Sequence, residues 1–188
     1  MSAELFYLVG KPNNLKQELV SQLKERLSED KDIIIPQVVT TDPEVAEGDN
    51  YIHVEENDFR LRDSMGMYCL KWRKKGHFYG VVADVVQRLN TGVDIVINGS
   101  FHNLEQAKTQ FPNLNTVIIK KQGVSSQSSS NQYLIAEEED VKLEWNDKDG
   151  DMYHPYVLSM LSEDNVEKGI EILIGLFAYD RKSLAKVI

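Results

Sequence analysis

The stretch LVGKPNNLKQEL, residues 8 to 19, sets the beginning of the fold. It joins the apolar run ELFYLV, residues 4 to 9, to a segment with helical spacing. Gly10 and Pro12 end the apolar run, and Asn13 or Asn14 is placed to cap the helix that follows. The apolar positions of that helix fall on one face: Leu15, Leu19, Val20, Leu23 and Leu27. We therefore expect a buried strand, a short polar loop and an amphipathic helix.

The composition is that of a soluble globular domain with an excess of acidic residues. The 188 residues carry a formal net charge of −9, which argues against general binding to nucleic acid or to anionic lipid. No run approaches the roughly 18 apolar residues of a membrane span, and no basic segment precedes the first apolar stretch. The single cysteine, Cys69, excludes an intramolecular disulfide. We expect a cytoplasmic protein without nucleic-acid or membrane partners.

The rest of the chain alternates between strand and helix patterns. Strands are expected in residues 32–41 (broken by Pro36), 50–54, the hairpin 67–81, 93–100 and 115–121, with one or two more in 133–145. Helices are expected in residues 55–64, 81–92, 103–111 and 162–177. This order predicts a mostly parallel sheet wrapped by helices, with its active site beyond the carboxyl ends of the strands. Residues 122–132 form a serine-rich loop.

Several motifs in this order resemble one family. KWRKKGHFYGVVADVVQRLNTGVDIVINGSFHNLEQA (71–107) resembles the middle of the bacterial ribose 1,5-bisphosphate phosphokinases, relatives of guanylate kinase among the P-loop kinases. GDNYIHVEENDF (48–59) and LSEDNVEKGIEILIGL (161–176) add matches to the acceptor segment and the last helix. The resemblance implies a P-loop kinase-like α/β fold. Its core would comprise residues 1–42, 80–121 and 155–188, with an acceptor insert at 43–79 and a degenerate lid region at 122–154.

Such a kinase holds ATP and Mg²⁺ at the first loop, and the resemblance implies which residues would do so here. They are Gly10, Asn13, Asn14, Lys16 and Gln17, with Lys16 as the catalytic phosphate contact. Leu15 stands where the family has a second glycine, and Gln17 stands where it has the hydroxyl that binds Mg²⁺. The alternative is that Lys16 is a solvated helix residue. If Leu15 packs inward and Gln17 caps the helix, the site is closed to triphosphate.

The lid region is also altered. A lid arginine can contribute ~10³ to 10⁵ in rate to phosphoryl transfer. No arginine occurs between Arg88 and Arg181, and residues 136–151 hold eight acidic residues against two lysines. Such a field opposes ATP. The sequence contains no spacing of histidines or of Cys69 that indicates a metal site.

The acceptor side retains more of the pattern. The hairpin gathers Lys71, Arg73, Lys74, Lys75 and His77 in an otherwise acidic chain. The resemblance implies that Tyr79 contacts the acceptor phosphate and that Asn98 and Ser100 line the site at the end of a strand. We expect Lys71, Arg73, Tyr79, Asn98 and Ser100 to bind the acceptor, whereas Lys74 and Lys75 are equally consistent with a solvated turn. Thr41 and Phe101 replace two arginines that the family pattern predicts.

Two hypotheses follow. The first is a non-catalytic or weakly active descendant that binds a phosphorylated small molecule or a protein partner. The second is an active kinase that transfers phosphate from ATP, with Mg²⁺, to a sugar phosphate or a nucleoside monophosphate. The loop chemistry favours the first.

Overall fold

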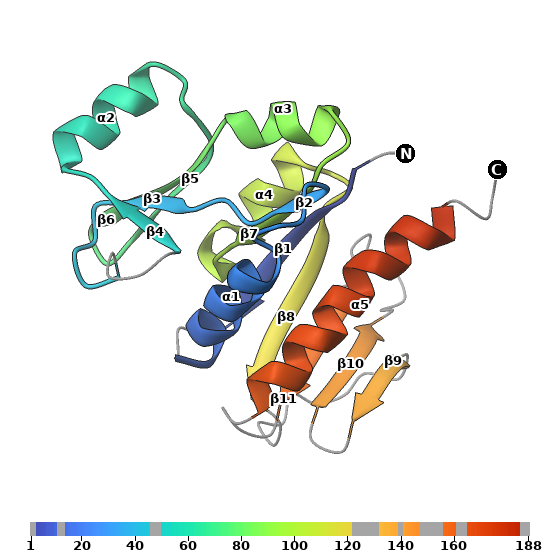
Figure 1. Cartoon of the computed structure of the whole chain (residues 1–188). Helices are drawn as coiled ribbons and strands as arrows, with labels where there is room; N and C mark the ends of the chain where they lie inside the picture. The colour runs from blue at the N-terminus through green and yellow to red at the C-terminus, as the bar shows by residue number, and fades with distance from the viewer. Residues whose placement is uncertain are drawn as a thin grey trace. The chain divides into compact units, whose positions relative to one another are not determined.

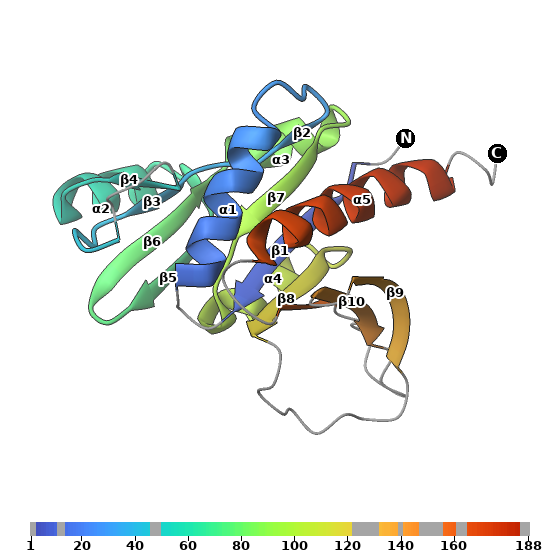
Figure 2. The same cartoon turned by 60° about the horizontal axis from the view of Figure 1, so that its bottom comes forward.

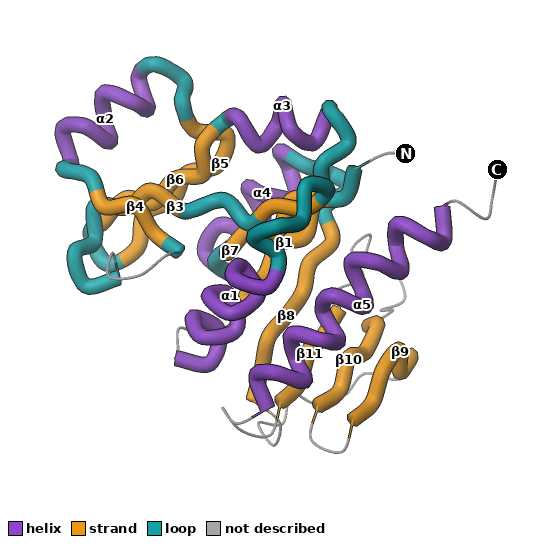
Figure 3. Tube along the Cα trace, in the orientation of Figure 1, coloured by secondary structure: helices purple, strands orange, loops and turns teal. Residues whose placement is uncertain are grey.

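The computed structural model describes residues 3–10, 14–45, 50–121, 132–138, 141–146, 156–160 and 165–184. The chain divides into two compact units. Unit 1 comprises Met1, Leu8–Leu23 and Asn115–Ile188, and unit 2 comprises Ser2–Tyr7 and Lys24–Leu114. Figure 3 shows which parts of each unit are helix and which are strand. Strand β1 (Leu5–Gly10) contributes residues to both units, because the division falls within it.

Unit 1 contains the carboxyl half of β1 and four further strands in the order β1-β8-β11-β10-β9. Their bounds are β8 Asn115–Lys121, β9 Gln132–Glu138, β10 Val141–Asn146 and β11 Tyr156–Met160. Strand β11 runs parallel to β8, with Tyr156 opposite Val117. Strand β10 pairs antiparallel with both β11 and β9. The described part of the expected lid region thus forms two strands of this sheet.

Unit 1 also contains helix α5 (Val166–Leu184) and most of helix α1 (Asn14–Arg26), of which the residues from Lys24 onward are assigned to unit 2. The i, i+4 spacing of α1 buries Leu15, Leu19 and Leu23, each with 2% of its surface exposed or less. Helix α5 contacts β10 and β11. Figure 1 shows it running beside both strands, and Figure 2 shows it with β10 from another side. Its buried residues are Val166, Ile170, Leu173, Leu176 and Phe177. The sequence places Ser162 or Asp164 to cap this helix, and both residues lie outside the described part of the chain.

Unit 2 contains the amino half of β1 beside β7 (Asp94–Asn98) and β2 (Ile33–Ile34), in the order β2-β7-β1. Strand β2 is parallel to β7. Helix α3 (Asp84–Asn90) precedes β7 in the chain, and a 3₁₀ turn at Phe101–Asn103 followed by α4 (Leu104–Gln110) comes after it. All five residues of β7 are buried, the polar Asp94 and Asn98 at its ends as well as the three apolar residues between them.

A separate four-stranded sheet lies within unit 2, in the order β4-β3-β6-β5. Its strands are β3 Val38–Thr40, β4 Tyr51–His53, β5 Tyr68–Lys74 and β6 His77–Val82. Helix α2 (Glu56–Ser64) covers one face of it (Figure 1). We call this face the helix face. Its core contains Val39, Val54 and Phe59, packed by Tyr68, Phe78 and Val82.

The hairpin between β5 and β6 turns at Lys75 and Gly76, as the KKG pattern predicts. Both residues have positive φ, 49° for Lys75 and 91° for Gly76, which is the conformation of a two-residue type I′ turn. Such a turn fixes the register of the strands that it joins. Lys74 lies opposite His77, Arg73 opposite Phe78 and Trp72 opposite Tyr79.

Three sequence expectations differ from the structure. The helix expected from residue 81 begins at Asp84, because Val81 and Val82 still pair with β5. Strand β11 was not expected, since its five residues follow a long acidic stretch. The segment broken by Pro36 supplies two different sheets, with β2 in one and β3 in the other. Strand β3 therefore joins the small sheet although it precedes residue 43, where the insert was expected to begin.

Within the described residues, no helix is both long and apolar enough to cross a membrane.

Candidate functional site

Gly10 ends strand β1, and the packing of unit 1 explains why this position has no side chain. A Cβ atom at this position would lie 2.8 Å from the backbone oxygen of Ile119 on β8. Real Cβ atoms do not approach a carbonyl oxygen so closely, and the oxygen belongs to a paired strand that cannot easily move. The packing of β1 against β8 therefore requires glycine here, whether or not a phosphate binds.

Lys16 lies in the first turn of α1 and is buried, with 7% of its surface exposed. Its Cδ atom is 3.5 Å from the position that a Cβ of Gly10 would occupy. The aliphatic part of the side chain thus packs over the end of β1, as long basic side chains often do. The alternative interpretation of Lys16 as a solvated helix residue is wrong.

Leu15 precedes Lys16 and points into the core of unit 1, with 2% of its surface exposed. A branched, buried side chain thus occupies the position that the resemblance assigns to a glycine of the phosphate loop. Gln17 is partly exposed. Asn13 lies outside the described residues, whereas Asn14 begins α1. Of the expected nucleotide contacts, Gly10 and Lys16 are therefore the two that the structure brings together.

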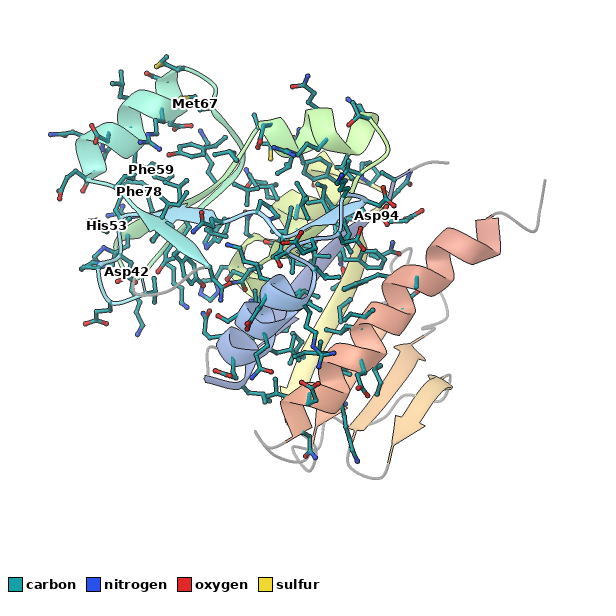
Figure 4. The ribbon with its side chains drawn as sticks, viewed as in Figure 1. Asp42, His53, Phe59, Met67, Phe78 and Asp94 are labelled. Atoms are coloured by element: carbon teal, nitrogen blue, oxygen red, sulfur yellow. The ribbon has the colours of Figure 1, made fainter. Side chains whose placement is uncertain are left out.

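The three expected acceptor residues of the hairpin, Lys71, Arg73 and Tyr79, lie on two different faces of the small sheet. Lys71 and Arg73 project on the helix face. The Nζ atom of Lys71 donates to both carboxylate oxygens of Asp63 on α2, at 2.7 and 2.9 Å. The guanidinium of Arg73 lies 5.3 Å from the centroid of the Phe78 ring, and its Nε donates to the backbone oxygen of Gly76. Figure 4 shows Phe78 beside Phe59 under α2.

Tyr79 lies on the opposite face, which we call the polar face. It is 4% exposed, and its ring stacks on Trp72 with centroids 5.5 Å apart. Its hydroxyl donates a hydrogen bond of 2.6 Å to Oδ2 of Asp42. Backbone atoms hold Asp42 in turn, because the Glu44 amide donates to Oδ1 at 3.1 Å and the Asp42 amide donates to Thr40 Oγ1 at 3.0 Å. The structure therefore separates Tyr79 from Lys71 and Arg73.

The Tyr79–Asp42 hydrogen bond changes the acidity of both groups. Burial raises the pKa of Tyr79, and the Asp42 carboxylate raises it further, so the tyrosine keeps its proton throughout the physiological range. Burial alone would raise the pKa of Asp42. The Tyr79 hydroxyl, the Glu44 amide and the charges of His77 and Lys74 outweigh burial and hold this pKa below its usual value. Asp42 is thus a carboxylate at neutral pH.

Asn98 ends β7 and approaches the same cluster. It is 3% exposed, and its Nδ2 donates to the Tyr51 hydroxyl at 3.3 Å. Tyr51 lies close enough to Tyr79 to contribute to the raised pKa of Tyr79. No donor among the described residues lies within hydrogen-bonding distance of Asn98 Oδ1. Buried polar atoms are nearly always paired in folded proteins. Asn98 Oδ1 is therefore an acceptor for which the described residues supply no donor.

Ser100 has a local structural role. Its Oγ accepts from the backbone amide of His102 at 3.3 Å and caps the 3₁₀ turn, while its own amide donates to the Tyr7 hydroxyl at 3.2 Å.

Sequence reasoning missed Asp42, Tyr51 and Thr40, which all face Tyr79. The two-residue hairpin turn was the available signal, because it pairs Trp72 with Tyr79 and so assigns Arg73 to the other face. No group of three or more described His, Cys, Asp or Glu residues is arranged to hold a metal ion.

The fold is that of guanylate kinase. The chain superposes on guanylate kinase from Anaplasma phagocytophilum with a TM-score of 0.51 and 17% identity, covering 65% of this chain and 62% of that one. The expected α/β P-loop kinase-like fold, a mostly parallel sheet flanked by helices, is therefore confirmed.

Similarity of sequence leads to a more particular group. The chain is 28% identical over 116 residues to the ribose 1,5-bisphosphate phosphokinase of Thiobacillus denitrificans, covering 62% of this chain and 61% of that protein. It is 32% identical over 119 residues to the enzyme of Azotobacter vinelandii, covering 63% and 64%. The matches thus span somewhat less than two thirds of these relatives. No family model matches the chain. The expected resemblance is confirmed: the chain is similar in sequence to the ribose 1,5-bisphosphate phosphokinases and in fold to guanylate kinase.

Proposed function

We propose that this protein binds a phosphorylated small molecule on the polar face of the small sheet and transfers phosphate from ATP weakly or not at all. The observation that supports this proposal is the burial of Leu15. A phosphate loop works because glycine lets backbone N–H groups approach the phosphate oxygens. Here that position is part of the core of unit 1, so any loop movement that admits a phosphate must expose a leucine.

The residues present also fit Mg²⁺ poorly. Mg²⁺ takes oxygen ligands at 2.0–2.1 Å in near-ideal octahedral geometry, and kinases of this fold supply a hydroxyl directly after the loop lysine. Gln17 offers a neutral amide on a longer stem at that place. The residue after Lys16 therefore supports weak transfer from ATP or none.

One observation favours the alternative of an active kinase. Lys16 is buried against Gly10, so its side chain is held at the mouth of the loop. That is where a kinase of this fold keeps a lysine for the β- and γ-phosphates. The same packing is explained by burial of the aliphatic stem on β1.

A transfer assay separates the two functions. The protein is incubated with γ-labelled ATP, Mg²⁺ and either ribose 1,5-bisphosphate or GMP, the substrates suggested by the names of its relatives. We expect no transfer above that of a Lys16→Ala variant, together with a rise in the unfolding temperature at millimolar sugar phosphate. Transfer that disappears in Lys16→Ala would establish the kinase function instead.

A further inference from the structure

The polar face gathers three groups that accept hydrogen bonds. Asp42 is a buried carboxylate, 7% exposed, and Asn98 Oδ1 is a buried amide oxygen without a donor among the described residues. Tyr79 has a single hydroxyl proton, which it donates to Asp42 at 2.6 Å. With this proton engaged, the Tyr79 oxygen has only lone pairs to offer a ligand. Tyr51 links the group to Asn98, so these residues form one cluster within unit 2.

An ionised carboxylate has about four lone-pair positions. Among the described residues, Asp42 Oδ2 accepts a hydrogen bond from the Tyr79 hydroxyl, and Oδ1 accepts one from the Glu44 amide. These two bonds leave part of the accepting capacity of the carboxylate unused within the described part of the chain. A ligand that supplies further N–H or O–H donors would complete this set, whereas a ligand that supplies only acceptors would compete with it.

We infer that the Asp42–Tyr79–Asn98 cluster selects the hydrogen-bond-donating part of a ligand, such as the hydroxyls of a sugar, and that Asp42 keeps phosphate away from Tyr79. This inference rests on the proposed function and names the chemistry recognised at the same site. It assigns Asp42 as the specificity-determining residue, a position at which the sequence pattern gave no expectation.

The charge of Asp42 explains the exclusion of phosphate. A phosphate oxygen that accepted the Tyr79 proton would take it from the carboxylate. At an ordinary hydrogen-bond length from the Tyr79 oxygen, it would lie roughly 5 Å from the Asp42 oxygen that is 2.6 Å from the same hydroxyl. At an effective dielectric constant of about 20, two unit negative charges at that separation weaken binding by a factor of about 10². Lys74 and His77 are the charged groups that act on Asp42 from this face. The phosphate of the same ligand would therefore bind beside Lys74 and His77.

The test uses two probes, ribose 5-phosphate and inorganic phosphate, and follows the backbone amide resonances of the full chain by NMR. Wild-type protein is compared with Asp42→Asn and Tyr79→Phe. The matched control is Asp63→Asn, which removes the same charge from the helix face. We expect ribose 5-phosphate to shift the amides of Asp42, Tyr79 and Asn98, and Asp42→Asn to weaken its binding at least 10-fold.

Inorganic phosphate should behave in the opposite way. It should leave the Tyr79 amide unshifted in wild-type protein and bind there at least 10-fold more tightly in Asp42→Asn. This gain should vanish when Tyr79→Phe is added, and Asp63→Asn should resemble wild type. Equal phosphate binding in wild type and Asp42→Asn would overturn the inference. If ribose 5-phosphate shifted no resonance at all, the proposed function would fail, and the comparison with phosphate would still decide the role of Asp42.

Discussion

Replacing Leu15 with alanine tests whether the former loop position has become part of the core. Leu15 is 2% exposed and lies in the first turn of α1, so the substitution deletes apolar atoms that are fully removed from water. Truncation of a buried leucine to alanine costs about 2–5 kcal/mol, from the lost transfer free energy and the cavity left behind. Helix propensity hardly opposes this loss, since alanine and leucine are both good helix formers.

The assay is urea unfolding at pH 7 followed by circular dichroism, with Leu61→Ala as the matched control. Leu61 also lies in a helix, α2, but 60% of its surface is exposed. Its truncation should change the free energy of unfolding by less than about 0.5 kcal/mol. A Leu15→Ala variant that lost less than about 1 kcal/mol, or no more than the control, would refute the burial argument. The loop would then be free to rearrange around a phosphate.

Three further predictions concern other parts of the chain. Because the folded pKa of Asp42 is lowered, its carboxylate stabilises the fold above an unfolded pKa of about 3.9, and this stability is lost as pH falls through the folded pKa. Between pH 5 and 2, Asp42→Asn should therefore lose less free energy of unfolding than wild type. An equal loss for both proteins in urea unfolding would contradict this prediction. Burial raises the pKa of Cys69 to about 11, so iodoacetamide at pH 8 should react about 10²-fold more slowly with folded than with unfolded protein. Gly99→Ala places a methyl group 2.2 Å from the buried ring of Tyr7 and should lower the free energy of unfolding by about 1–3 kcal/mol in thermal unfolding. Gly175→Ala lies at an exposed helical position with nothing within 4 Å of the new methyl group, and it should raise the free energy of unfolding by about 0.5–1 kcal/mol.

Much of the fold could be predicted because it depends on local patterns. The run ending at Gly10, the buried strand ending at Asn98 and the glycine turn at Gly76 each specify an element from a few adjacent residues. Strand β11 could not be predicted in this way. Its pairing with β8 is between residues far apart in sequence, and its five residues carry no clear alternation.

The site was predicted less well, because its geometry depends on which face each strand residue takes. Strand alternation places Lys71 and Arg73 on one face and Trp72 on the other, and the register of the hairpin agrees. The family pattern then grouped Tyr79 with the two basic residues, although the register of the hairpin assigns it to the other face. The role of Asp42 depends on a contact between residues 37 positions apart, which no local pattern indicates.

The most direct test of the central claim is calorimetric titration of the whole protein with ATP and Mg²⁺, with Lys16→Ala as the control. If burial of Leu15 closes the loop to triphosphate, no heat of binding should be detected up to millimolar ATP. Micromolar binding that is abolished by Lys16→Ala would contradict the account, because it would require the loop to open around the phosphates despite the leucine.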